Sequence, residues 1–210
     1  RRVLFRSSFV VFPFIENQIN KAGNSFNKGK YDEALHLSKS ALVRSFKIND
    51  DYLIAHSYNA IGVIYDEFSQ SKQAIAFYNK ALLYASRIEN DSLNDWIYSN
   101  LGSVYYFRKI DVNKGITFYK KSLEYATKIN DSVQITYTKL NIASAYFSLN
   151  DYKNGISYIN QTQDYINRKG QNEMRFTTAS LLGTYNTNIN QPELALKYYT
   201  EAIAIAQKYE

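Results

Sequence analysis

Cysteine is absent from this chain of 210 residues, and histidine, proline and glycine are scarce. Without cysteine there is no disulfide framework, no thiolate zinc site and no cysteine nucleophile. With only His36 and His56, a metal site built from several histidines is excluded. Two prolines and eight glycines argue against a loop-rich all-β protein. Hydrophobic residues make up 45% of the chain, enough for a sizeable core, so wholesale disorder is excluded.

The formal net charge is +6, and three of the positive charges lie in residues 1–7. This segment, Arg-Arg-Val-Leu-Phe-Arg-Ser, matches the translation of a common sequencing adapter. We interpret it as a non-native scar, the alternative being a genuine basic N-terminus. Without Arg1, Arg2 and Arg6 the charge falls by three, to +3. Such a balance predicts no nucleic-acid partner for this region.

Residues 8–14 contain the one strongly apolar run. The run is far shorter than the roughly 20 residues that a membrane-spanning helix needs. We interpret it as an apolar linker or as the remnant of a signal peptide or membrane anchor. No membrane contact is predicted for residues 15–210.

Small residues recur at a fixed spacing along the rest of the chain. The spacing within each of two series is 40 or 41 residues, and the second series follows the first in phase. The first series is Ala22, Gly62, Gly102, Ala143 and Gly183, and the second is Ala34, Ala74, Gly115, Gly155 and Ala195.

Each unit has the apolar spacing of two helices joined by a polar turn. Ile54, Tyr58, Ile61 and Tyr65 are spaced 4, 3 and 4 residues apart, which places them on one face of a helix. Two helices approach closely only where one side chain is nearly absent, so Gly62 and its equivalents mark the contact inside each hairpin. We therefore predict ten helices in five hairpins, in units of about 15–49, 50–90, 91–130, 131–170 and 171–210. A single hairpin cannot bury its apolar face, so the units must stack.

The local signals agree with these boundaries. Asn-Asp pairs recur between units, at residues 49–50, 90–91 and 130–131, where an oxygen side chain can cap the next helix. Gly29 and Asn150 lie in turns inside hairpins, where a left-handed backbone is often needed. Pro192 lies where a helix begins.

These residues resemble the signature of the tetratricopeptide repeat. The match reads Tyr58, Ile61-Gly62, Tyr65, Ala74, Tyr78 and Ala81, and again Tyr98, Leu101-Gly102, Tyr105, Gly115, Tyr119 and Ser122. It covers roughly residues 15–210, although the period near 40 exceeds the usual 34 and resembles the longer variant of bacterial sensor and regulator proteins. The resemblance implies an all-α, right-handed α-solenoid with a concave groove.

The resemblance further implies that the groove binds a protein or peptide and that the chain is no enzyme. Its lining would come from the outward positions of the first helices. We expect an aromatic anchor at Tyr106, Phe107 and Phe147, unless these rings pack against the neighbouring repeat. The chaperone-binding members hold a C-terminal carboxylate with a lysine-containing clamp, which Asn59, Val63, Ser99 and Ser103 do not reproduce. The full expected groove set is His56, Asn59, Asp66, Glu67, Trp96, Ser99, Ser103, Tyr106, Phe107, Leu140, Ser144 and Phe147.

No catalytic, metal or cofactor site is predicted. Residues 23–30 superficially resemble a phosphate-binding loop, but the spacing is one residue too long and no strand precedes it. Asp66 and Glu67 are adjacent on a helix, so they do not share a face for acid–base chemistry. Lys114, Lys120 and Lys121 are interpreted as a solvated face.

The favoured hypothesis is an interaction module, the sensor or scaffold part of a larger bacterial signalling or regulatory protein. The alternative is the repeat domain of a response-regulator phosphatase-like protein, or of a DNA-binding regulator, without its output domain. Either would place the chain in the cytoplasm or on the periplasmic side of a membrane-anchored protein.

Overall fold

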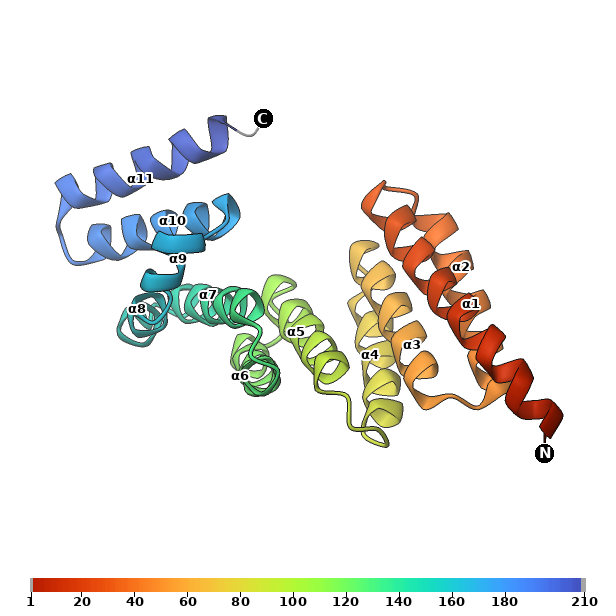
Figure 1. Cartoon of the computed structure of the whole chain (residues 1–210). Coiled ribbons are helices and arrows are strands. Elements are labelled where there is room, and N and C mark those ends of the chain that lie inside the picture. The colour runs from red at the N-terminus through yellow and green to blue at the C-terminus, as the bar shows by residue number, and fades with distance from the viewer. Residues whose placement is uncertain (1, 209–210) are drawn as a thin grey trace.

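The chain folds as an array of antiparallel helical hairpins. The computed structural model describes the backbone of residues 2–208 and the side chains of residues 11–208, and the backbone of this range forms eleven helices and no strand. Figure 1 shows the hairpins stacked side by side, with α1 and α11 at opposite ends. The helices are α1 (Arg2–Asn27), α2 (Tyr31–Ile48), α3 (Asp51–Glu67), α4 (Ser71–Ala85), α5 (Asp91–Phe107), α6 (Val112–Lys128), α7 (Ser132–Ser148), α8 (Tyr152–Asn160), α9 (Gln163–Lys169), α10 (Asn172–Asn188) and α11 (Pro192–Gln207).

The hairpins pair α1 with α2, α3 with α4, α5 with α6, α7 with α8, and α10 with α11. The all-α solenoid predicted from the sequence is confirmed. The number of helices is eleven rather than ten, because the second helix of the fourth hairpin breaks into α8 and α9 at Gln161 and Thr162. The Thr162 hydroxyl donates to the Ile159 carbonyl oxygen at 2.7 Å, and such side-chain bonds compete with the helical ladder.

The expected capping and turn residues take the predicted conformations. Asp50, Asn90 and Asp131 each accept a hydrogen bond from a backbone N–H in the first turn of the next helix. Gly29 and Asn150 have φ of 72° and 58°, in the left-handed region. The sequence therefore sets where each hairpin starts and turns.

The hairpins close where a ring on the second helix lies over a glycine on the first. A Cβ added to Gly62 would lie 2.6 Å from the Tyr78 ring, and one added to Gly102 would lie 2.5 Å from the Tyr119 ring. Ala74, Ala143 and Ala195 are also buried, as expected for the small-residue series. These contacts fix the hairpin geometry, which in turn fixes the outward faces of the first helices.

The N-terminal helix is continuous through the segment expected to be a linker or anchor remnant. α1 includes residues 8–14, with Pro13 inside it, and Val11 and Phe12 pack against the core of the first two hairpins. The side chains of the proposed scar, residues 1–7, lie outside the described part of the chain, as do residues 209–210. None of the helices in the described range has the length and apolar character that crossing a membrane requires.

Candidate functional site

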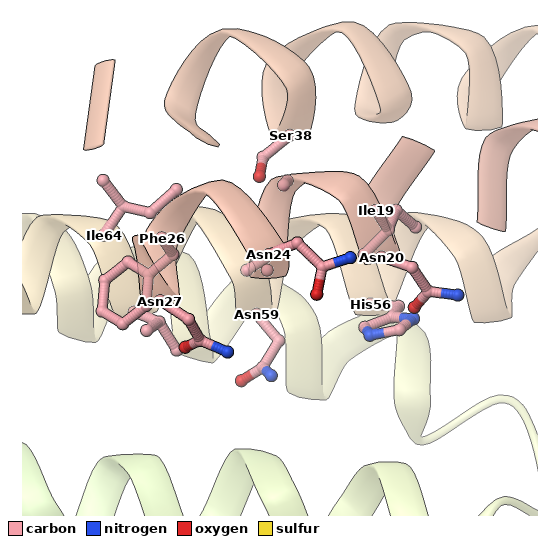
Figure 2. Close-up of a pocket in the computed structure, with 13 residues that line it drawn as sticks. Ile19, Asn20, Asn24, Phe26, Asn27, Ser38, His56, Asn59 and Ile64 are labelled. Atoms are coloured by element: carbon pink, nitrogen blue, oxygen red, sulfur yellow. The ribbon is translucent and has the colours of Figure 1, made fainter. Parts of the chain in front are cut away.

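A cavity of about 410 Å³ lies among the first two hairpins. Its walls come from α1 and α3, the first helices of those hairpins, with Ser38 of α2 behind them. Figure 2 shows Asn20, Asn24, His56 and Asn59 gathered on one side of it. The lining residues are Ile19, Asn20, Ala22, Gly23, Asn24, Phe26, Asn27, Ser38, His56, Asn59, Ala60, Val63 and Ile64.

The lining combines carboxamides with apolar side chains and contains no charged residue. Asn20, Asn24 and Asn27 follow one another at spacings of four and three residues, so they share a face of α1. Each carboxamide offers both hydrogen-bond donors and an acceptor. Ile19 and Ile64, both buried, supply apolar surface beside them. The cavity is therefore suited to a neutral ligand with amide or hydroxyl groups and an apolar part.

His56 contributes a neutral imidazole to this site. Burial lowers the pKa of His56 to about 4, so the ring is uncharged at neutral pH. Its centroid lies 5.7 Å from that of Tyr52 and 5.8 Å from that of Trp96. The Nδ1 atom is buried and has no hydrogen-bond partner within the described range, and the same holds for Oγ of Ser38. Two polar atoms at one cavity thus lack the partners that buried polar groups ordinarily have.

The site is tied to the third hairpin by polar contacts. The Asn100 amide of α5 donates to Oδ1 of Asn59 at 3.0 Å. Arg108 pairs with Asp66, its Nε lying 2.9 Å from Oδ1, and also donates to Oγ of Ser69 at 3.2 Å. Asp66 is therefore part of an ion pair between hairpins.

The other expected groove residues are divided between surface and internal contacts. Trp96 is 45% exposed and Phe107 is 64% exposed, and the Phe107 ring lies 4.7 Å from that of Tyr106. Glu67 is exposed and accepts a hydrogen bond from the Tyr31 hydroxyl at 3.1 Å. Ser99 is half-buried on α5. Ser103 shares a hydrogen bond of 3.0 Å with the hydroxyl of Tyr119, and Ser144 donates to the Leu140 carbonyl oxygen at 2.9 Å.

Two residues expected in the groove lie in the core instead. Phe147 is 6% exposed and packs with Ile159 and against Gly155, where no Cβ would fit beside its ring. Leu140 is 2% exposed and packs with Ile166 and Met174. Both assignments are corrected, because the apolar side chains of α7 fill the space toward α8, α9 and α10. The predicted aromatic anchor is reduced to Tyr106 and Phe107.

The asparagines of α1 are functional candidates that the sequence reasoning missed. The first hairpin matched the repeat signature poorly, so its outward positions were not listed. The spacing of Asn20, Asn24 and Asn27 is the signal that could have found them, because it places three carboxamides on one helical face.

These observations define the class of protein, a stack of helical hairpins with a polar cavity on its first helices. The family model of the tetratricopeptide repeat matches residues 55–87 and 137–163. The chain is a tetratricopeptide-repeat protein. Comparison by sequence with curated proteins gives no match.

Solved structures of repeat proteins share the fold. BtubC from P. vanneervenii has a TM-score of 0.78 and 17% identity, over 99% of this chain and 85% of that one. A STAND ATPase with a tetratricopeptide repeat sensor, from Pyrococcus horikoshii, has a TM-score of 0.81 and 19% identity, over 97% of this chain and 31% of that one. The Rap conjugation gene regulator of plasmid pLS20, solved with the Phr* peptide, has a TM-score of 0.69 and 16% identity, over 97% of this chain and 56% of that one.

Proposed function

We propose that this chain is a peptide-binding interaction module, and that the cavity between α1 and α3 holds an uncharged stretch of an extended peptide. The observation that carries the proposal is a cavity of about 410 Å³ whose polar lining consists of carboxamides, one serine and a neutral imidazole. A peptide backbone presents alternating N–H and C=O groups. Side-chain amides pair with both kinds of group.

The unpaired atoms of the cavity support the same ligand. Oγ of Ser38 and Nδ1 of His56 are buried without partners, and a peptide N–H or C=O reaching them would restore a hydrogen bond to each. The buried side chains of Ile19 and Ile64 form an apolar floor for one aliphatic or aromatic side chain of the peptide. A charged terminus has no counter-ion among the lining residues.

The exposed aromatic side chains of α5 extend this surface beyond the cavity. Trp96 contacts His56 at the edge of the site, and Phe107 lies at the other end of the same helix. Large exposed rings supply contact area at low entropic cost, so we assign them as secondary anchors for a longer peptide. The sensor named in the Pyrococcus horikoshii ATPase and the peptide bound to the pLS20 regulator support a role as the sensor or scaffold of a larger signalling protein.

The proposal is tested by filling the cavity without harming the fold. Gly23 lines the cavity, and a Cβ added there would meet nothing within 4 Å. Gly23→Leu therefore occupies the cavity and raises the helix propensity of α1 by up to about 1 kcal/mol. Short random peptides displayed on phage are selected on the unaltered chain. The recovered peptides are then titrated calorimetrically against each variant.

We expect Gly23→Leu to abolish binding while leaving the thermal unfolding midpoint equal or higher. Asn24→Ala and Asn59→Ala are expected to weaken binding by about 3- to 10-fold each, the effect of losing one hydrogen bond. The matched control Asn79→Leu introduces the same side chain on the exposed face of α4 and should change nothing. Equal binding by Gly23→Leu and Asn79→Leu would overturn the proposal.

A further inference from the structure

The two ends of the array differ in what they present to solvent. Inside the array, the position before the small residue of each first helix is apolar and packs against the preceding hairpin. Ile61, Leu101 and Ile142 are all at most 1% exposed there. In α1 the same position is Lys21, which is exposed and charged. The outer face of α1 is therefore polar and suited to water.

The outer face of α11 is apolar. Tyr78 and Tyr119 are 1% and 0% exposed, whereas Tyr199 at the same position of α11 is 38% exposed. Ile116 and Ile156 pack against the first helix of the following hairpin, whereas their equivalent Leu196 is 68% exposed. Within the described range no helix lies beyond α11, the outermost helix of Figure 1. The same surface that stacks hairpins elsewhere is thus open here.

The exposed stripe of α11 has the same spacing in both directions. Leu196, Tyr199, Ile203 and Ala206 are separated by three, four and three residues, and none is charged. Two copies of α11 placed antiparallel would therefore oppose Leu196 with Ala206 and Tyr199 with Ile203 along the whole stripe. A spacing of three and four residues is the one at which two helices pack side by side.

A second feature fits the same arrangement. An apolar cavity of about 310 Å³ lies between α10 and the end of α11, lined by Phe176, Ile205 and Ala206 with Asn172 and Glu173. Phe176 is 42% exposed. Because Ala206 would face Leu196 of the other copy, that leucine would enter this cavity.

We propose that α11 is a self-association surface, on which a second copy of this chain docks through its own α11 about a two-fold axis. The polar face of α1 offers no apolar partner for α11, so the contact is the same patch on both copies and closes as a dimer. One helix per copy makes a small interface, so the dimer is expected to form at concentrations of roughly 10 to 500 µM.

Sedimentation equilibrium across this concentration range tests the proposal. The unaltered chain is expected to shift from monomer to dimer mass, and Ile203→Glu is expected to stay monomeric. Leu83→Glu is the matched control, because Leu83 on α4 is 56% exposed, as is Ile203. A monomer throughout, or equal dimerisation of the two variants, would overturn the proposal.

Cross-linking tests the antiparallel geometry separately. The chain has no cysteine, so a single introduced thiol reports one position. Thr200→Cys lies beside the centre of the stripe, and a short bis-maleimide should link two copies. Thr117→Cys on α6, also exposed, should remain unlinked. Equal linking at both positions, or none at Thr200→Cys, would exclude the two-fold contact through α11.

Discussion

The hairpins α3/α4 and α7/α8 share one repeat pattern but use the same positions differently. Asn59 and Leu140 occupy equivalent places on the first helix, as do Asp66 and Phe147. In α3 the two residues are polar, and they line the cavity or pair with the third hairpin. In α7 they are apolar and buried. A groove position in the repeat is therefore open or closed according to its side chain and its neighbours.

The ring that closes each hairpin also comes from a different helix. Tyr78 of α4 lies over Gly62 of α3, whereas Phe147 of α7 lies over Gly155 of α8. The fourth hairpin has Ala143 and Ile159 where the second has glycine and tyrosine. One small residue facing one large ring satisfies the packing requirement in either direction.

The largest effect expected from this difference is the loss of the Phe147 ring. Phe147→Ala leaves a cavity beside Gly155 and Ile159, and should lower the free energy of unfolding by about 3–5 kcal/mol. Phe107→Ala removes a ring that is 64% exposed and should change it by about 0.5 kcal/mol or less. Urea unfolding of both variants measures the difference, and similar losses would contradict the assignment of Phe147 to the core and Phe107 to the surface.

A second effect concerns two buried titratable groups on neighbouring first helices. The pKa of His56 falls from 6.5 to about 4 on folding, through burial. Burial raises the pKa of Asp95 from 3.8 to about 6, although its hydrogen bond from Ser122 lowers it and the charge of Asp131 raises it further. Asp95 lies between α5 and α6, where α3 has Ala55. The polar first helices thus carry groups whose stability contributions depend on pH.

The two contributions have opposite signs. Between pH 6.5 and 4 the unfolded chain binds a proton at His56 more readily than the folded chain, so the free energy of unfolding falls as the pH falls. Between pH 6 and 3.8 the folded chain holds the proton of Asp95 more tightly, so it rises as the pH falls. Each amounts to at most about 3 kcal/mol, so the two roughly offset one another.

Asp95→Asn should therefore uncover the His56 contribution. We expect its stability, measured by urea unfolding at several pH values, to fall between pH 6.5 and 4 more steeply than that of the unaltered chain. His56→Gln should do the reverse and gain stability as the pH falls from 6 to 4. Parallel pH profiles for the three proteins would show that neither group is buried as the structure has it.

The smallest expected effect tests the exchange of ring and small residue. Gly62→Ala puts a Cβ 2.6 Å from the Tyr78 ring and should cost about 1–3 kcal/mol of stability. In the background of Tyr78→Ile, which reproduces the pairing of Ala143 with Ile159, the same change should cost clearly less. A double-mutant cycle by thermal unfolding gives the coupling, and additive effects would mean that the two residues do not share one space.

Much of the fold follows from the sequence because its causes are local. The spacing of the small residues, the caps at Asp50 and Asp131 and the turn at Gly29 all depend on residues within a few positions of each other. The structure confirms the array and the hairpin contacts. The break at Thr162 was not predicted, because the competing hydrogen bond to Ile159 differs little in energy from the helical one.

The sequence by itself determined the repeat, its period and which residues face the partner helix inside each hairpin. Only the tertiary structure decided which outward positions stay open. Leu140 and Phe147 are buried because α8, α9 and α10 surround α7, while Asn20, Asn24 and Asn59 line a cavity because α1 and α3 leave space between them. Burial depends on elements distant in the sequence, and the spacing within one helix does not contain that information.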